Sequence, residues 1–288
     1  MTNTIPDLGY TPIADIFKLP PGVNFGPCSG VAVNAKDHVL VFNRSENALM
    51  EFDSRGNHIR TLGRGIFTNP HGLRIDREGN IWCTDTGSHI VVKMNADGRI
   101  LMVLGVAGRA GEWHAAGHLR CFNEPNDLAF AANGDVYITQ GHGKGDNLVH
   151  RFTANGDHVK TWGGTGKDKG KFDQPHSIVI NGKGLLYIAD RSNARIQVFD
   201  ADGNLVARAA MFREELLVVD VDIEPVYRKR LLDPRGRRTD KQMRVVAISE
   251  QPGSDMLVRT AKRLADGLNA PWTAVHIETA RSAAFDDD

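Results

Sequence analysis

The chain has 288 residues, a hydrophobic content of 41% and a formal net charge of zero, because 35 Lys and Arg residues balance 35 Asp and Glu residues. Such a balance gives no global field toward nucleic acid or a membrane surface, and no apolar run is long enough to span a bilayer. Three cysteines are too few for a disulfide framework. Because residues 1–19 lack a basic end followed by an apolar stretch, we expect a cytoplasmic protein.

A unit of short strands occurs four times between residues 29 and 212, after a lead-in of residues 1–28 that we expect to lie against the first copy. Each copy has an opening strand, a turn rich in Asn, Asp and Gly, a second apolar strand, a polar corner and a third strand. The residues at the same opening position recur at steps of about 40–55 residues: Ser29, His71, Asn126 and His176. Short β-branched and aromatic runs repeating at this step predict the blades of an all-β propeller.

The fourth copy resembles a known repeat. Pro175-His176-Ser177 opens a strand, and residues 187–200 read YIADRSNARIQVFD. These residues resemble the NHL-repeat β-propeller, and within it the peptidyl-α-hydroxyglycine α-amidating lyases, over roughly residues 20–210. That fold usually has six blades, of which four are legible here. The resemblance implies a zinc-dependent lyase that cleaves a peptidyl-α-hydroxyglycine into a peptide amide and glyoxylate, and it allows calcium as a further ion.

The resemblance also implies roles for residues at the polar corners. Arg44 and Arg191 match two arginines that hold the substrate carboxylate and take part in catalysis. His142 stands where the lyases carry a tyrosine base, and an imidazole can act as a base near neutral pH, but this departure leaves the lyase chemistry open. Asn126, at the opening position of the third copy, is a candidate for substrate binding.

Two histidines share a register in alternate copies. In a six-bladed ring, alternate blades are about 120° apart, so that side chains at one register converge on the axis. Three histidines placed in this way would form the open tripod that catalytic zinc requires. We therefore predict His71 and His176 as metal ligands; the alternative is two polar channel residues with ordinary partners. His276 lies at a suitable distance for a third ligand, but it is in a strand of the tail and we exclude it, leaving water, His142 or a partner chain to complete the site.

The stretch between the second and third copies, residues 105–121, is the longest insert. His114 and His118 have the i,i+4 spacing of helical metal ligands, but the glycines around them oppose a helix. We expect an ordinary loop.

The pattern changes after residue 212. Residues 213–242 form a basic connecting segment, which we interpret as a solvated loop that does not bind nucleic acid. Residues 243–288 predict a β-α-β segment with strands at 243–248 and 272–278 and an amphipathic helix at 254–268. Residues 215–240 resemble the edge of a nitrilase-type hydrolase, and residues 243–279 resemble the opening of a universal-stress-protein-like domain of sensor kinases.

Three functions follow from these patterns. The first is the zinc lyase with a small-molecule or peptide substrate. The second is a non-catalytic propeller that binds a peptide or a protein partner. The third is a composite chain with no single activity, because the 76 residues after Phe212 are too few and wrongly patterned for two more blades.

Overall fold

The computed structural model describes residues 13–111, 113–114, 119–142, 146–208, 244–248 and 272–276. The chain divides into two compact units, Met1–Phe122 and Asn123–Asp288. In the described part of the chain, no helix is long and apolar enough to cross a membrane.

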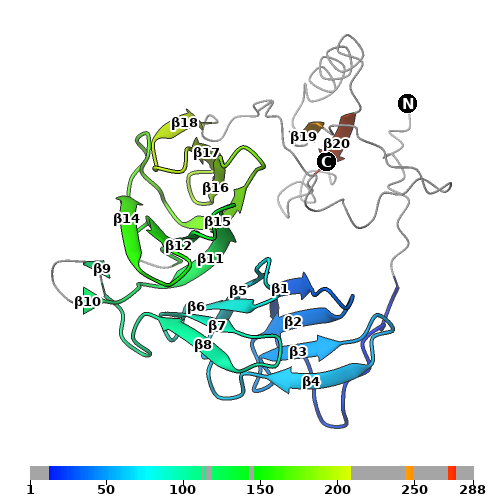
Figure 1. Ribbon diagram of the computed structural model, residues 1–288. Helices are drawn as coiled ribbons and strands as arrows, with labels where there is room; N and C mark the ends of the chain where they lie inside the picture. The colour runs from blue at the N-terminus through cyan, green and yellow to red at the C-terminus, as the bar shows by residue number, and fades with distance from the viewer. Residues whose placement is uncertain are drawn as a thin grey trace, which may run out of the picture. The chain divides into compact units, whose positions relative to one another are not determined.

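The first unit contains two four-stranded antiparallel sheets in which neighbouring strands follow one another along the chain (Figure 1). The strands of the first sheet are β1 (Cys28–Val33), β2 (Val39–Asn43), β3 (Leu49–Phe52) and β4 (His58–Leu62). Those of the second are β5 (Pro70–Ile75), β6 (Ile81–Asp85), β7 (Ile90–Met94) and β8 (Ile100–Leu104). Each sheet is one of the predicted blades.

The second unit repeats this arrangement with two further four-stranded antiparallel sheets. The third blade consists of β11 (Pro125–Phe130), β12 (Val136–Gln140), β13 (Leu148–Phe152) and β14 (His158–Gly163). The fourth consists of β15 (Pro175–Ile180), β16 (Leu186–Asp190), β17 (Arg195–Phe199) and β18 (Leu205–Arg208). The prediction of an all-β fold with four blades is therefore confirmed.

Every blade has a fourth strand, which the sequence prediction left unnamed. In the first and fourth blades, an aspartate at the end of the third strand organises the turn that leads into it. Asp53 Oδ1 accepts hydrogen bonds from the backbone N–H groups of Arg55 and Asn57, and Asp200 Oδ1 accepts the equivalent pair. Gly56 completes the first of these turns at φ 79°, a conformation that favours glycine.

Within each unit, the opening strands of the two blades lie side by side, β1 with β5 and β11 with β15. Apolar side chains from the facing sheets fill the space between the blades. In the first unit they include Leu40, Phe42, Leu49, Leu73, Ile90 and Met94. In the second unit they include Tyr137, Phe172, Ile178, Leu186, Ile188 and Phe199. Stacking in this way buries a face that one blade alone would expose.

The described part of the lead-in covers the other face of the first blade, as predicted. The rings of Phe17 and Phe25 lie 4.7 and 5.8 Å from the ring of Phe52. Leu19 and Val23 pack against the same cluster.

The insert of residues 105–121 contains two short paired strands where an ordinary loop was expected. β9 (Trp113–His114) pairs with β10 (Leu119–Arg120) in antiparallel fashion. Trp113 is buried and its ring lies 4.8 Å from that of Phe122, which gives the insert an apolar anchor. His114 is in a strand, and His118 lies outside the described residues.

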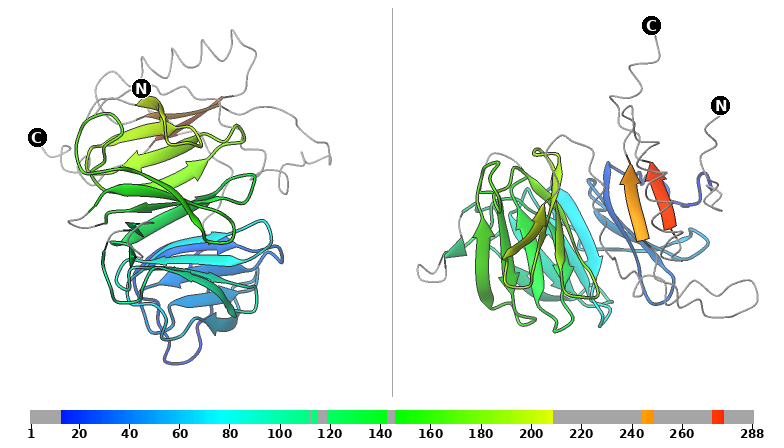
Figure 2. Two further views of the ribbon diagram at one scale, coloured as in Figure 1. Left: turned by 60° about the vertical axis from the view of Figure 1, so that its left-hand side comes forward. Right: turned by 90° about the horizontal axis from the view of Figure 1, so that it is seen from above.

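Two strands of the tail are described, β19 (Arg244–Ile248) and β20 (Trp272–His276), and they pair in parallel. Figure 2 shows them as adjacent orange and red arrows. Parallel neighbours require a crossover connection, which fits the predicted β-α-β segment. The predicted helix and the connecting segment of residues 213–242 lie outside the described residues.

Candidate metal centre

Each opening position coincides with a distortion of its blade. The first two strands of every blade pair regularly except at the start, where the register shifts. The shifts fall between Cys28 and Gly30, between Pro70 and Leu73, between Pro125 and Asp127, and between Pro175 and Ser177. They therefore enclose Ser29, His71, Asn126 and His176. Because a β-bulge redirects the side chain that it contains, these positions are suited to carry a site.

In the second unit, the structure brings His142 and His176 together. Their ring centroids are 5.3 Å apart with an interplanar angle of 42°, and each ring offers a nitrogen within 4.8 Å of the other. Both side chains are half-buried. His176 comes from the bulge of β15, and His142 from the corner after β12.

The surroundings of His176 favour its neutral form. Burial, with the positive charges of Arg191 and His142, lowers the pKa of His176 from its ordinary value to about 4. At neutral pH its ring nitrogen keeps the lone pair that a metal needs. Two nitrogens on one tetrahedral zinc ion are about 3.3 Å apart, so a small rotation of either ring would let both bind the same ion. The donor chemistry of this pair therefore fits zinc.

The other predicted residues of the second unit have different environments. Arg191 is exposed, and its backbone N–H donates to the carbonyl of Gln174 at 3.0 Å. Asn126 is fully buried, and its Oδ1 accepts a hydrogen bond from the Thr139 hydroxyl at 2.5 Å. Arg191 is thus open to an anionic ligand, whereas the amide oxygen of Asn126 is engaged within its own blade.

The first unit places Arg44 against the strand that carries His71. Arg44 Nε donates to the carbonyl of Pro70 at 3.2 Å, and His71 follows in the bulge of β5, half-buried. Arg44 is exposed at the corner after β2.

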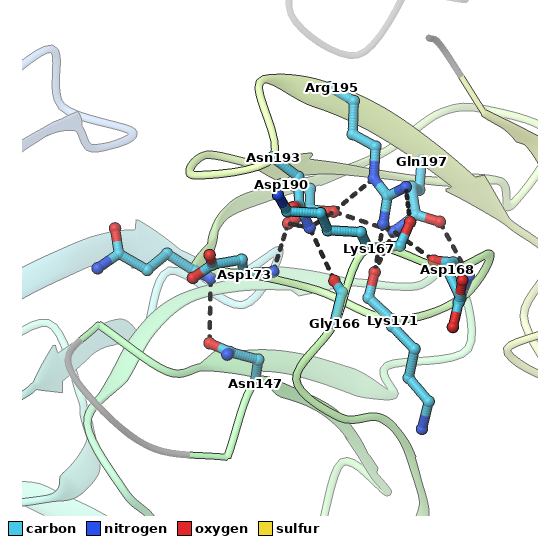
Figure 3. Close-up of polar contacts among 12 residues, drawn as sticks. Asn147, Gly166, Lys167, Asp168, Lys171, Asp173, Asp190, Asn193, Arg195 and Gln197 are labelled. Carbon is cyan, nitrogen blue, oxygen red and sulfur yellow. Dashed lines mark hydrogen bonds and ion pairs between the residues drawn. The ribbon is translucent and has the colours of Figure 1, made fainter. Parts of the chain in front are cut away.

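A buried ion pair fixes the loop that leads into β15. Arg195 and Asp190 are both inaccessible to solvent, with Nε and Oδ2 2.7 Å apart. Figure 3 shows the guanidinium of Arg195 meeting the backbone carbonyls of Lys167, Asp168 and Lys171. Asp190 also accepts a hydrogen bond from the backbone N–H of Asp173. The ion pair therefore fixes both the loop of residues 167–171 and the segment that leads into the strand of His176.

Asp190 therefore organises its corner. The same position ends the second strand of each blade with a fully buried polar residue: Asn43, Asp85, Gln140 and Asp190. Each accepts a backbone N–H from the segment before the opening strand, from Gly26, Thr68, Asn123 and Asp173.

Sequence reasoning missed Gln174, whose side chain bridges the corners of His142 and Arg191. Its Nε2 donates to the carbonyl of His142 at 3.1 Å, and its Oε1 accepts from the Ser192 hydroxyl at 3.0 Å. The repeat pattern carries no signal for this residue, because the contacts join corners of two different blades.

The NHL repeat family matches residues 172–199, in the fourth blade, and the four-stranded antiparallel blades have the fold of an NHL-type β-propeller. The chain is 31% identical over 208 residues to a probable peptidyl-α-hydroxyglycine α-amidating lyase of Caenorhabditis elegans, which covers 63% of this chain and 57% of the relative. It is 33% identical over 208 residues to NHL repeat-containing protein 3 of Mus musculus, covering 68% and 56%. The chain thus spans just over half the length of these two relatives.

A solved structure of a streptogramin B lyase superposes with a TM-score of 0.51 over 69% of this chain and 59% of that one, at 16% identity. This likeness supports the fold alone. The nitrilase-type and universal-stress-protein-like resemblances of the tail remain predictions.

Proposed function

We propose that this protein is a zinc-dependent lyase that cleaves a peptidyl-α-hydroxyglycine into a peptide amide and glyoxylate. The observation that carries the proposal is the pair of His142 and His176, two half-buried imidazoles with ring nitrogens within 4.8 Å. The homology to an amidating lyase supports the choice of substrate.

His176 and His142 would hold the metal in the second unit. The register of the repeats adds His71 as the third ligand, a proposal that rests on the sequence. Bound zinc would supply a Lewis acid to polarise the substrate hydroxyl. Calcium remains a prediction from the family resemblance.

The arginines would bind the substrate. Arg191 is exposed and close enough to His176 for its charge to lower the pKa of that histidine, so a carboxylate held by Arg191 would lie beside the imidazole pair. Arg44 would hold the same carboxylate by resemblance. Asn126 would contribute its amide to the substrate site. An arginine suits this task because its planar fork matches a carboxylate.

His142 is the residue whose role differs most between hypotheses. As a base it would replace the tyrosine of the lyases, and as a ligand it would supply a nitrogen to the metal. The close approach of its ring to that of His176 favours the ligand role. The two roles give different metal contents in the His142→Ala variant.

Elemental analysis of purified protein tests the proposal. We expect about one zinc per chain in the wild type, with strong loss in His176→Ala, His71→Ala and His142→Ala. His158→Ala, a histidine substitution in the same unit, is the matched control and should keep its zinc. Glyoxylate release from an α-hydroxyglycine peptide should fall in parallel. Zinc retained in His142→Ala with activity lost would assign His142 as the base.

A second function has one specific observation in its favour. The relative NHL repeat-containing protein 3 is as similar to this chain as the lyase, and its name states only the repeat. A well-folded wild type without zinc and without glyoxylate release would favour a propeller that binds a peptide or protein.

A further inference from the structure

Gln174 is in contact with three segments that carry candidate site residues. Its side chain reaches the carbonyl of His142 and the hydroxyl of Ser192. Its own carbonyl accepts the backbone N–H of Arg191. Two residues further on is His176. One residue thus connects the backbone at His142, the corner of Arg191 and the strand of His176.

The main chain of Gln174 is itself held by a side chain of the third blade. Its backbone N–H donates to Oδ1 of the buried Asn147 at 3.0 Å, and Nδ2 of Asn147 donates to the Thr165 hydroxyl at 2.9 Å. The main chain of Gln174 is therefore fixed by hydrogen bonding, and its side chain can hold the His142 carbonyl and the Ser192 hydroxyl at defined positions.

The backbone of Gln174 has a conformation that glycine adopts more readily. Its φ is 60°, in the left-handed region, and it directly precedes Pro175. Residues other than glycine are uncommon there and cost free energy that the surroundings must offset. Glu124, before Pro125 in the third blade, has the same conformation at φ 57°. A glutamine at such a position, despite the free-energy cost, is consistent with a specific role for its side chain.

We propose that Gln174 is a positioning residue that holds the His142 corner and the Arg191–Ser192 corner against His176. The proposal deepens the function proposed above and rests on it for the meaning of the site. The amide suits the task because it donates to one corner and accepts from the other, which a carboxylate or an aliphatic side chain cannot do.

Without the side chain of Gln174, the His142 carbonyl loses the hydrogen bond that joins its corner to the residue before β15. The two imidazoles would no longer be kept at a ring distance of 5.3 Å, and binding of an ion by both would require ordering the corner first. Loss of such a supporting contact typically weakens metal binding by 10–100-fold, with values of about 10-fold expected for a single amide.

The test uses the full chain and compares Gln174→Gly with Glu124→Gly. Both replace a residue before a proline at positive φ, so both relieve the same backbone strain, but only the first removes the bridge. The metal-free readout is the nuclear Overhauser effect between the rings of His142 and His176 in chelator-treated protein. The second readout is the zinc dissociation constant from competition with a chromophoric chelator.

We expect Gln174→Gly to lose the inter-ring effect and to bind zinc about 10-fold more weakly, while Glu124→Gly behaves as the wild type. Gln174→Glu, which keeps an acceptor for Ser192 but has no donor for the His142 carbonyl, should also lose the inter-ring effect. It serves as the second test if the glycine variant does not fold.

The proposal would be overturned if the nuclear Overhauser effect between the rings of His142 and His176 persisted in Gln174→Gly and Gln174→Glu. It would also be overturned if Glu124→Gly lost this effect to the same extent. Failure of the proposed function is a separate outcome. If the wild type binds no zinc, the proposed lyase activity is wrong. The nuclear Overhauser effect between the two rings would still decide whether Gln174 positions His142.

Discussion

At the scale of single residues, the buried histidine of the third blade makes stability depend on pH. His150 is fully buried on β13, with Nδ1 2.8 Å from the Thr161 hydroxyl. Burial, and to a smaller extent the charge of His158, lowers the pKa of His150 to about 3. The imidazole of His150 binds a proton near pH 6.5 in the unfolded chain but not in the folded chain. Its contribution to the free energy of unfolding is therefore fully present above pH 6.5 and is lost as the pH falls toward 3.

We therefore expect the free energy of unfolding to fall by about 2 kcal/mol between pH 7.5 and 5 on account of His150 alone. The measurement is urea unfolding at both pH values for the wild type and for His150→Gln, whose side chain does not titrate. The difference between the two pH dependences isolates His150 from the other histidines. Equal pH dependence in both proteins would contradict the expectation.

Residue identity allowed part of the candidate site to be predicted. The register of the repeats selected His71, Asn126 and His176, and the structure places a β-bulge at each of them. The sequence offered His142 only as one of three ways to complete the metal site, and it gave no indication of the bridge of Gln174. Those contacts join corners of different blades, and the relative placement of loops depends on packing rather than on local pattern.

At the scale of the element, the loop before β15 depends on Arg195. The guanidinium donates to three backbone carbonyls of that loop and to the buried Asp190. Arg195→Met would leave a buried carboxylate without its counter-ion and would remove the guanidinium donors of three carbonyls, of which that of Lys171 keeps another donor, the side-chain amide of Gln197. Such losses cost about 3–5 kcal/mol.

Urea unfolding of Arg195→Met should therefore show that loss, whereas the exposed substitution Lys183→Met should stay within about 0.5 kcal/mol of the wild type. Because much of that cost is an unpaired buried charge, Asp190→Asn combined with Arg195→Met, which removes the charge and keeps an acceptor for the Asp173 N–H, should recover part of the stability. If Arg195→Met were as stable as the Lys183→Met control, other contacts would hold the loop before β15.

The elements also show where sequence patterns suffice. Alternating apolar residues and Asn-Gly turns predicted three strands of each blade, because strand pairing between chain neighbours is a local matter. The fourth strand was not predicted because the repeat unit was defined to end with its third strand, although β8 is apolar throughout its sequence. The pair of β9 and β10 was missed because its anchor, Trp113 on Phe122, is a tertiary contact.

At the scale of the whole molecule, the zinc lyase differs from the two alternative functions in how the folded chain responds to metal. A ligand that binds only the folded state stabilises it by about 2.7 kcal/mol when its concentration is 100 times the dissociation constant. For a chain of this size, each kcal/mol raises the melting temperature by about 2–4 °C. A zinc lyase should therefore melt about 5–10 °C higher with zinc than with a chelator.

Differential scanning calorimetry of the full chain measures this shift. We expect it in the wild type and in His158→Ala, and we expect it to vanish in His176→Ala, because the removed imidazole is one of the donors in the described pair. A binding propeller without a metal would melt in a defined transition that zinc leaves unchanged. A composite chain with no common site would show no zinc-dependent shift and no effect of His176→Ala, and that result would remove the lyase together with its metal centre.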